Sequence, residues 1–133
     1  MIWNGLRLGH WRSQAGYDLS DVLPKYWSFK IGDELNDKYR LEVSGYSGDA
    51  NNSLQYEGEW DGDGNFGGYY HSGMAFTTYD QDNDRYWTNC ASTRGGGWWF
   101  NDCFWVCLMC KATTYEWYSE VYVANSRMMI KPQ

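Results

Sequence analysis

The sequence contains little proline and no long apolar run, and each absence excludes a class of protein. Only 2 of its 133 residues are proline and 43% are hydrophobic, which excludes collagen-like and disordered chains. No apolar run approaches the ~20 residues that a membrane-spanning helix needs. Residues 1–14 also lack the apolar stretch of a signal peptide. We therefore predict one globular domain without a membrane span. If the protein is secreted, we expect its signal peptide to lie outside this sequence.

Lysine and arginine are absent from the middle of the chain. Residues 41–84 contain nine acidic residues and no basic one, whereas the remaining residues carry eight acidic and eleven basic side chains. Such an acidic block repels a phosphate backbone, so we expect no nucleic-acid partner. Clustered carboxylates favour binding of a hard cation, and a solvated acidic face explains the same composition equally well.

Aromatic residues and glycine are abundant, with 9 Trp, 12 Tyr and 15 Gly. This composition favours aromatic packing between tight turns and irregular loops. Alternating patterns predict strands over residues 26–31 and 39–43, paired antiparallel across the turn between them. Residues 44–73 are predicted to form a long loop, and short strands are expected over 74–79 and 127–130.

All four cysteines lie in one short window, at Cys90, Cys103, Cys107 and Cys110. A tetrathiolate zinc site normally shows two short C-x2-C pairs, and here only Cys107 and Cys110 form one. An even cysteine count and the sequon at Asn51 suit disulfides in a secretory compartment, with Asn51 as a glycosylation site. The spacing favours disulfides and leaves zinc open as the alternative.

Four strings occur in the order and near the spacing of one family. They are YRLEVSGYSGDANNSL (39–54), SGMAFTTYDQDNDRYWTNCA (72–91), GGGWWFNDC (95–103) and MMIKP (128–132). Together they resemble the fibrinogen-like C-terminal domain, the module of fibrinogen chains, ficolins, tachylectins, angiopoietins and tenascins. The best match covers residues 26–103.

The resemblance implies an α+β fold with a central twisted antiparallel sheet, short helices and a loop-rich subdomain that binds calcium and ligand. Residues 1–133 would then form a single, partial domain. Residues 1–25 are too few to supply the family's N-terminal subdomain, so we expect most of it to be missing.

A calcium site is predicted in the string DQDNDRYWTNC (80–90), where carboxylates alternate with other polar residues. Calcium takes six to eight oxygen ligands, and a tight Asp-rich loop can supply them. By resemblance, side-chain oxygens come from Asp82 and Asp84, and backbone carbonyls come from Tyr86 and Thr88. Asp80 would lie just outside this set. The alternative is an Asp-rich turn without metal.

The resemblance also implies a disulfide between Cys90 and Cys103, and a cis peptide bond between Asp102 and Cys103. For Cys107 and Cys110 three states stay open: a second disulfide with each other, a link to another chain, or free thiols.

In the lectin branch of the family, a pocket beside the second cysteine recognises acetyl groups, and a histidine follows that cysteine. Here Phe104 stands at that position, and much of the family's following segment is missing. The resemblance nevertheless implies a ligand-binding set, which we expect to comprise Asn89, Arg94, Trp98, Trp99, Asp102, Cys103 and Phe104.

We therefore predict a secreted, calcium-dependent recognition module that resembles ficolin-type lectins of innate immunity. Its partners would be acetylated glycans or microbial surface sugars, and it could form a homo-oligomer. One alternative is a protein-binding or structural extracellular module, as in the angiopoietin-like and tenascin relatives. Another is an incomplete gene product without an intact pocket.

No catalytic constellation stands out. His10 and His71 lie far apart in polar surroundings, and we expect both on the surface. The string GYSGD (45–49) has Asp49 where a nucleophile elbow requires glycine. We therefore expect no enzymatic activity.

Overall fold

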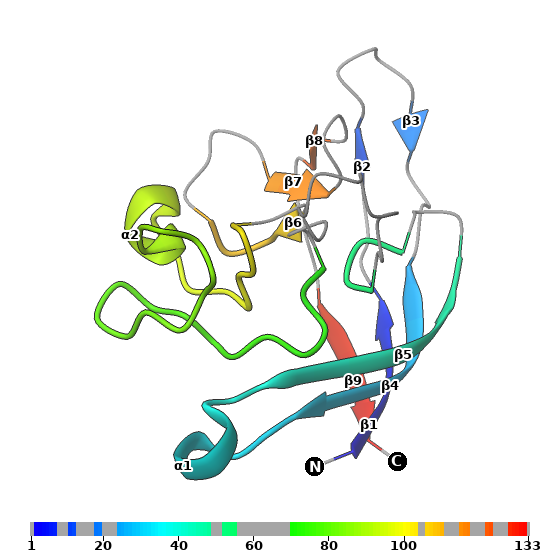
Figure 1. Ribbon diagram of the computed structural model, residues 1–133. Coiled ribbons are helices and arrows are strands. Elements are labelled where there is room, and N and C mark those ends of the chain that lie inside the picture. The colour runs from blue at the N-terminus through cyan, green and yellow to red at the C-terminus, as the bar shows by residue number, and fades with distance from the viewer. Residues whose placement is uncertain are drawn as a thin grey trace, which may run out of the picture.

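The computed structural model describes residues 2–7, 11–12, 18–19, 24–48, 52–55, 70–103, 106–110, 115–117, 122–123 and 128–132. Within these ranges the chain forms a curved antiparallel sheet and, on one side of it, a region of loops that contains a short helix (Figure 1). No helix among the described residues is long and apolar enough to cross a membrane.

The main sheet has four strands in the order β5-β4-β1-β9, and every neighbouring pair is antiparallel. The strands are β1 (Ile2–Arg7), β4 (Lys25–Ile31), β5 (Leu41–Ser47) and β9 (Met129–Pro132). Because the first and last strands pair, the two ends of the chain lie side by side in Figure 1.

Two smaller sheets and two short helices complete the described elements. One sheet pairs β2 (Trp11–Arg12) with β3 (Asp18–Leu19). The other joins β6 (Val106–Cys107), β7 (Tyr115–Trp117) and β8 (Tyr122–Val123). The helices are α1 (Glu34–Asp37), between β4 and β5, and α2 (Cys90–Arg94), in the loop region.

The predicted antiparallel pair over 26–31 and 39–43 is confirmed as β4 and β5. The predicted last strand over 127–130 corresponds to β9, at 129–132. The strand predicted over 74–79 is wrong. Its backbone N–H groups bond to four different places, His71, Lys38, Trp98 and Gln81, so only isolated bridges form.

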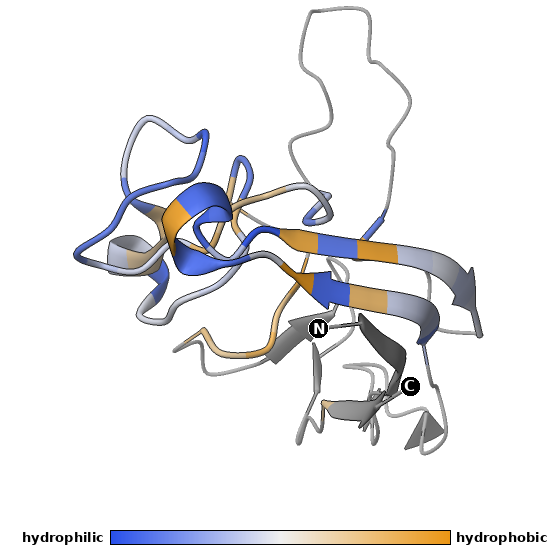
Figure 2. Ribbon diagram, turned by 90° about the horizontal axis from the view of Figure 1, so that it is seen from below, coloured by the Kyte–Doolittle hydropathy of each residue, from blue (hydrophilic) through white to orange (hydrophobic). Residues whose placement is uncertain are grey.

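The core lies between the β4–β5 pair and the loop region. Figure 2 shows apolar and polar segments alternating along both strands. Phe29, Leu41 and Val43 are buried, and the ring of Phe29 meets that of Trp99 edge-on at a centroid distance of 6.3 Å. The loop region thus supplies the second layer that covers this apolar face.

The corner after α1 ties the sheet to the loops. Lys38 and Tyr39 both have a left-handed backbone, with φ of 48° and 56°, which is costly for residues other than glycine. Both carbonyls of this corner accept hydrogen bonds from the loop region. Phe76 N–H donates to the Lys38 carbonyl at 2.9 Å, and the Trp99 indole N–H donates to the Tyr39 carbonyl at 2.7 Å.

Candidate functional site

The loop region is built around α2 and the glycine run that follows it. Asn89 caps the helix by accepting a hydrogen bond from Ser92 N–H at 2.9 Å, and Gly95 ends it in a left-handed conformation with φ of 73°. The Asn89 amide also donates to the carbonyls of Thr78 and Tyr79, at 2.9 and 3.3 Å. This one side chain therefore links α2 to the neighbouring segment 76–80.

Two disulfides close this region. Cys90 is bonded to Cys103, which is the pairing that the resemblance implies, and Cys107 is bonded to Cys110. No cysteine is free, so the zinc alternative is wrong.

The expected cis bond between Asp102 and Cys103 is also wrong, because the described residues contain no cis peptide bond. Cys103 instead adopts a left-handed backbone with φ of 51°.

His71 is fully buried, so its predicted surface position is wrong. Its Nδ1 lies 2.8 Å from the Trp99 carbonyl, and its Nε2 accepts a hydrogen bond from Val106 N–H at 3.3 Å. Burial lowers the pKa of the imidazole to about 4, against a smaller raising effect of the Trp99 carbonyl. The neutral ring thus connects the Cys90–Cys103 loop to the start of β6, and neighbouring residues in sequence gave no sign of this role.

Asp82 and Asp84 lie next to each other in the loop before α2. Asp84 N–H donates to Asp82 Oδ1 at 3.3 Å, while the Asp84 carboxylate accepts from the backbone N–H groups of Tyr86 and Cys90 at 3.0 Å each. Partial burial raises the pKa of Asp84, with the nearby Asp82 adding to the effect. A bound cation would relieve this effect of Asp82 on Asp84.

The donor set fits calcium better than a transition metal. Among the described residues, no cluster of three or more His, Cys, Asp or Glu side chains could hold a metal. Nor does a described N–H or O–H group donate to the carbonyl oxygens of Tyr86 or Thr88. The ligands that the resemblance implies, two carboxylates and two carbonyls, are all oxygens, a donor type that suits a hard cation completed by water.

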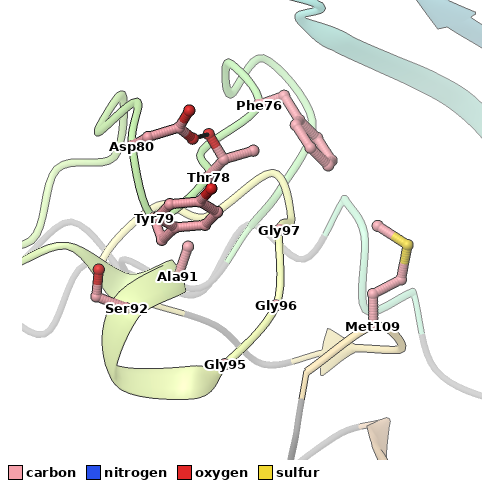
Figure 3. Close-up of a pocket in the computed structure, with 10 residues that line it drawn as sticks. All are labelled: Phe76, Thr78, Tyr79, Asp80, Ala91, Ser92, Gly95, Gly96, Gly97 and Met109. Atoms are coloured by element: carbon pink, nitrogen blue, oxygen red, sulfur yellow. Dashed lines mark hydrogen bonds between the residues drawn. The ribbon is translucent and has the colours of Figure 1, made fainter.

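An open hollow of about 630 Å³ lies between segment 76–80, α2 and the glycine run (Figure 3). Its apolar lining comes from Phe76, Tyr79, Ala91 and Met109, and its polar lining from Thr78, Asp80 and Ser92. Thr78 donates its hydroxyl proton to Asp80 at 2.7 Å. The volume is within the range of small-ligand sites, which is about 300–1,000 Å³.

The floor of the hollow is bare backbone, because Gly95, Gly96 and Gly97 complete its lining. A Cβ on Gly96 would overlap the Met109 carbonyl, and one on Gly97 would approach the Phe76 ring to 3.0 Å. Glycine is therefore required where the Cys107–Cys110 segment seats against the loop. In the sequence, the run of three glycines was the feature that indicated this close approach.

The structure divides the predicted ligand set into two groups. Trp98, Trp99 and Cys103 are 0%, 6% and 7% exposed. Their side chains belong to the core, so a ligand in solution cannot contact them. Asn89 is half-buried, and Arg94 and Asp102 are exposed. Of this set, none lines the hollow. Phe104 and the predicted glycosylation site Asn51 lie outside the described residues.

The sequence matches the family described as fibrinogen beta and gamma chains, C-terminal globular domain, over residues 13–132. The chain belongs to this family. Among relatives, this fibrinogen domain is 39% identical over 93 residues to fibrinogen-like protein 1 of Bos taurus, covering 67% of this chain and 27% of that protein. It is 36% identical over 117 residues to tenascin of Gallus gallus, covering 81% of this chain and 6% of that protein.

Solved structures agree with this assignment. The fibrinogen-like globe domain of human ANGPTL2 has a TM-score of 0.67 at 26% identity, covering 97% of this chain and 58% of that chain. Lamprey fibrin D-dimer, complexed with the peptide Gly-His-Arg-Pro-amide, has a TM-score of 0.70 at 25% identity, covering 99% and 46%. The predicted fibrinogen-like α+β fold is confirmed. The chain spans 58% and 46% of these two solved chains, and 27% or less of the two relatives above.

Proposed function

We propose that this fibrinogen domain is a non-enzymatic, extracellular recognition module that binds a peptide or protein partner in the hollow between segment 76–80, α2 and Gly95–Gly97. The observation that carries the proposal is the hollow itself, which is open, mainly apolar and floored by glycine backbone. Such a surface suits a protruding side chain of a partner. The lamprey fibrin structure with its bound peptide adds support by analogy.

An extracellular location agrees with the cysteine chemistry. All four cysteines are in disulfides, and such bonds persist in oxidising compartments. The Cys107–Cys110 bond also contributes to the site, because it closes the segment from which Met109 reaches the hollow.

The way His71 is used supports a non-enzymatic role. Both of its ring nitrogens are engaged with backbone groups, its side chain is buried, and its pKa is about 4. It therefore cannot exchange a proton with a substrate in solution near neutral pH.

Calcium has a structural role in this proposal. Bound by Asp82, Asp84 and the carbonyls of Tyr86 and Thr88, it would fix the loop that leads into α2. Asp84 already connects this loop to the helix through Cys90 N–H. Binding of the ion would thus hold the wall of the hollow that α2 supplies, without contacting the partner.

A lectin of the ficolin type is the second candidate. The observation that favours it is a pair of highly exposed rings near the proposed calcium loop, Tyr79 at 79% and Trp87 at 82% exposure. Exposed aromatic faces suit the apolar side of a sugar. The burial of Trp98 and Trp99 weighs against an acetyl pocket at the predicted position.

A display experiment tests the choice between these two functions. Random linear peptides displayed on phage would be selected on the oxidised domain in calcium, and acetylated glycans would be tested in parallel on an array. Ser92→Trp should fill the hollow and abolish binding of the selected peptides, whereas Ser92→Ala should retain it. Peptides that bind Ser92→Trp as well as wild type would contradict the proposal. Glycan binding that Ser92→Trp abolishes, without any selected peptide, would favour the lectin.

A further inference from the structure

Two of the described tryptophans are largely exposed to solvent. Trp87 is 82% exposed in the loop before α2, and Trp27 is 69% exposed on β4. Trp98 and Trp99, by contrast, are 0% and 6% exposed and belong to the core. Tryptophan is usually well buried, because its indole is large and mainly apolar. A chemical group attached to an exposed indole would meet solvent, whereas one attached to a core indole would disrupt the packing.

The exposure of Trp87 is built into its loop. The Asp84 carboxylate accepts the N–H of Tyr86 at one end of the segment 86–90 and the N–H of Cys90 at the other, at 3.0 Å each. Cys90 is also fully buried and disulfide-bonded. Both ends of the segment are thus fixed, and Trp87 lies between them. Its ring packs against the neighbouring Tyr86 ring at a centroid distance of 5.5 Å and otherwise faces solvent.

The sequence around Trp87 has the spacing that a tryptophan-modifying enzyme requires. Trp87 is followed at the third position by Cys90, in the string WTNC. C-mannosyltransferases of the secretory pathway act on the first tryptophan of W-x-x-W or W-x-x-C. Of the 9 tryptophans in the sequence, only Trp87 has Trp or Cys at that position. Trp27 has Lys30 there, in the string WSFK. The acceptor motif and an exposed indole therefore coincide at Trp87.

We propose that Trp87 is C-mannosylated when this chain passes through the secretory pathway. The donor is a polyprenyl-phosphate mannose. The bond between mannose C1 and the phosphate oxygen breaks, C1 forms a bond to the indole Cδ1 of Trp87, the Cδ1 proton leaves, and polyprenyl phosphate departs. The disulfides suit the oxidising compartment in which such a transfer takes place. This inference shares the extracellular location with the proposed function and goes beyond it, because Trp87 does not line the hollow.

The product suits the place where Trp87 lies. The rings of Tyr86 and Trp87 form an exposed aromatic pair on a loop that otherwise carries carboxylates. Exposed apolar surface of this kind favours association. An attached sugar is bulky and solubilising, so a mannose would cover part of the indole with hydroxyl groups and displace no core residue. Because the link is a carbon–carbon bond, hydrolysis would not remove it.

Peptide mass spectrometry tests the inference. The full chain would be expressed behind a signal peptide in cells that lack a C-mannosyltransferase, with and without the co-expressed enzyme. After reduction and alkylation, trypsin should release the peptides 86–94 (YWTNCASTR) and 26–30 (YWSFK). We expect most of peptide 86–94 to gain the mass of one hexose, and only when the enzyme is present. Peptide 26–30 contains the exposed Trp27 without the motif, so it should stay unmodified in both cases.

Three variants show that the indole and its motif are what the enzyme uses. Trp87→Phe should remove the hexose. Cys103→Ala keeps the motif but loses the disulfide, so it should still be modified, whereas Cys90→Ala loses both and should not be. The cysteine variants would be analysed from cell extracts as well as from the medium, so that a folding defect does not hide the result. Fragmentation distinguishes a C-linked hexose, which breaks across its ring, from an O-linked hexose on the serine or threonines, which is lost whole.

An unmodified peptide 86–94, in cells whose enzyme modifies a co-expressed W-x-x-W acceptor, would overturn the inference. A hexose that fragmentation places only on serine or threonine would also overturn it, as would one that persists in Trp87→Phe. None of these results affects the proposed function, since Trp87→Phe should bind the display-selected peptides as the wild type does. A mannosylated Trp87 in a domain that selects no peptide would support this inference and overturn the proposed function.

Discussion

The β4–β5 pair and the loop region 70–103 share one core but are held by different bonds. The two strands are joined by regular backbone pairing from Lys25↔Ser47 to Ile31↔Leu41. The loop region has little such pairing, and polar side chains replace it. Asn83 bonds to Phe76, Asn101 to Tyr70, and His71 to Trp99. Buried backbone groups need hydrogen-bond partners. In the loop region these side chains supply the partners that a neighbouring strand supplies in a sheet.

This difference predicts how the two regions tolerate change. In a pair of strands the hydrogen bonds join backbone groups, so they do not depend on which side chains are present. In the loop region, one asparagine or histidine satisfies groups that no other residue reaches. Single polar substitutions should therefore be costly in the loops and nearly neutral on the exposed face of the sheet. Four experiments test this contrast, from the largest expected effect to the smallest.

Removing the Cys90–Cys103 bond should have the largest effect. The double variant Cys90→Ala/Cys103→Ala should lose about 3 kcal/mol of unfolding free energy, since the bond closes a loop with a sequence separation of 13. Cys107→Ala/Cys110→Ala, with a separation of 3, should lose about 2 kcal/mol. Denaturant unfolding of both variants measures the ranking. A reversed order would mean that the short Cys107–Cys110 bond is the main staple of the loops.

Calcium should raise the midpoint of thermal unfolding in the wild type and not in Asp82→Ala. At 100 times its Kd, a ligand adds ~2.7 kcal/mol, which corresponds to several degrees. Melting curves in calcium and in EDTA measure this shift, with Glu42→Gln as an acidic control on the sheet. Equal shifts in wild type and Asp82→Ala would place the ion elsewhere, and no shift in either would leave the loop without a metal.

Acid should weaken the domain through His71. Its pKa is about 4 in the folded state and near 6.5 when unfolded, so the unfolded chain binds the proton more tightly. The contribution of the neutral ring to the free energy of unfolding is therefore complete above pH 6.5. It falls as the pH drops toward 4, and about 2 kcal/mol is lost at pH 5. Chemical unfolding at stepped pH measures this slope.

His71→Gln supplies the control for that slope. The glutamine does not titrate, so the variant should be less stable at neutral pH and lose less on acidification than the wild type. Asp84 acts in the opposite direction because burial raises its pKa, and the difference between the two proteins removes its contribution. Identical slopes would mean that the His71 ring titrates in an open, hydrated environment.

Substitutions of single polar side chains should cause the smallest losses of stability, and they compare the loops with the sheet most directly. Asn83→Ala should lose about 1 kcal/mol, because the Phe76 carbonyl and Lys38 ammonium lose their partner at 2.8 and 2.9 Å. Glu42→Gln should lose less than about 0.5 kcal/mol, since its contact with Lys30 is an exposed 4.0 Å pair. Denaturant midpoints distinguish the two, and equal losses would contradict the proposed contrast between loops and sheet.

Sequence patterns predicted β4 and β5 because one face of each strand is buried, which produces visible alternation. They did not predict β1, the strand between β4 and β9. Its pairing with β9 shifts register between Trp3 and Leu6, and such an irregularity breaks the period of two. The segment 74–79 alternates without being a strand, since its partners are scattered through the fold.

For the site, the sequence determined the parts that depend on residue type and local spacing. These are the alternating aspartates of the Asp80–Cys90 loop and the glycine run that admits a close backbone approach. The family resemblance implied the Cys90–Cys103 bond, and the structure decided the state of Cys107 and Cys110. Only the tertiary structure decided that Trp98 and His71 are buried and that Phe76, Asp80, Ser92 and Met109 surround one hollow. The physical reason is that burial and concavity depend on which distant segments pack together, and local sequence does not encode that choice.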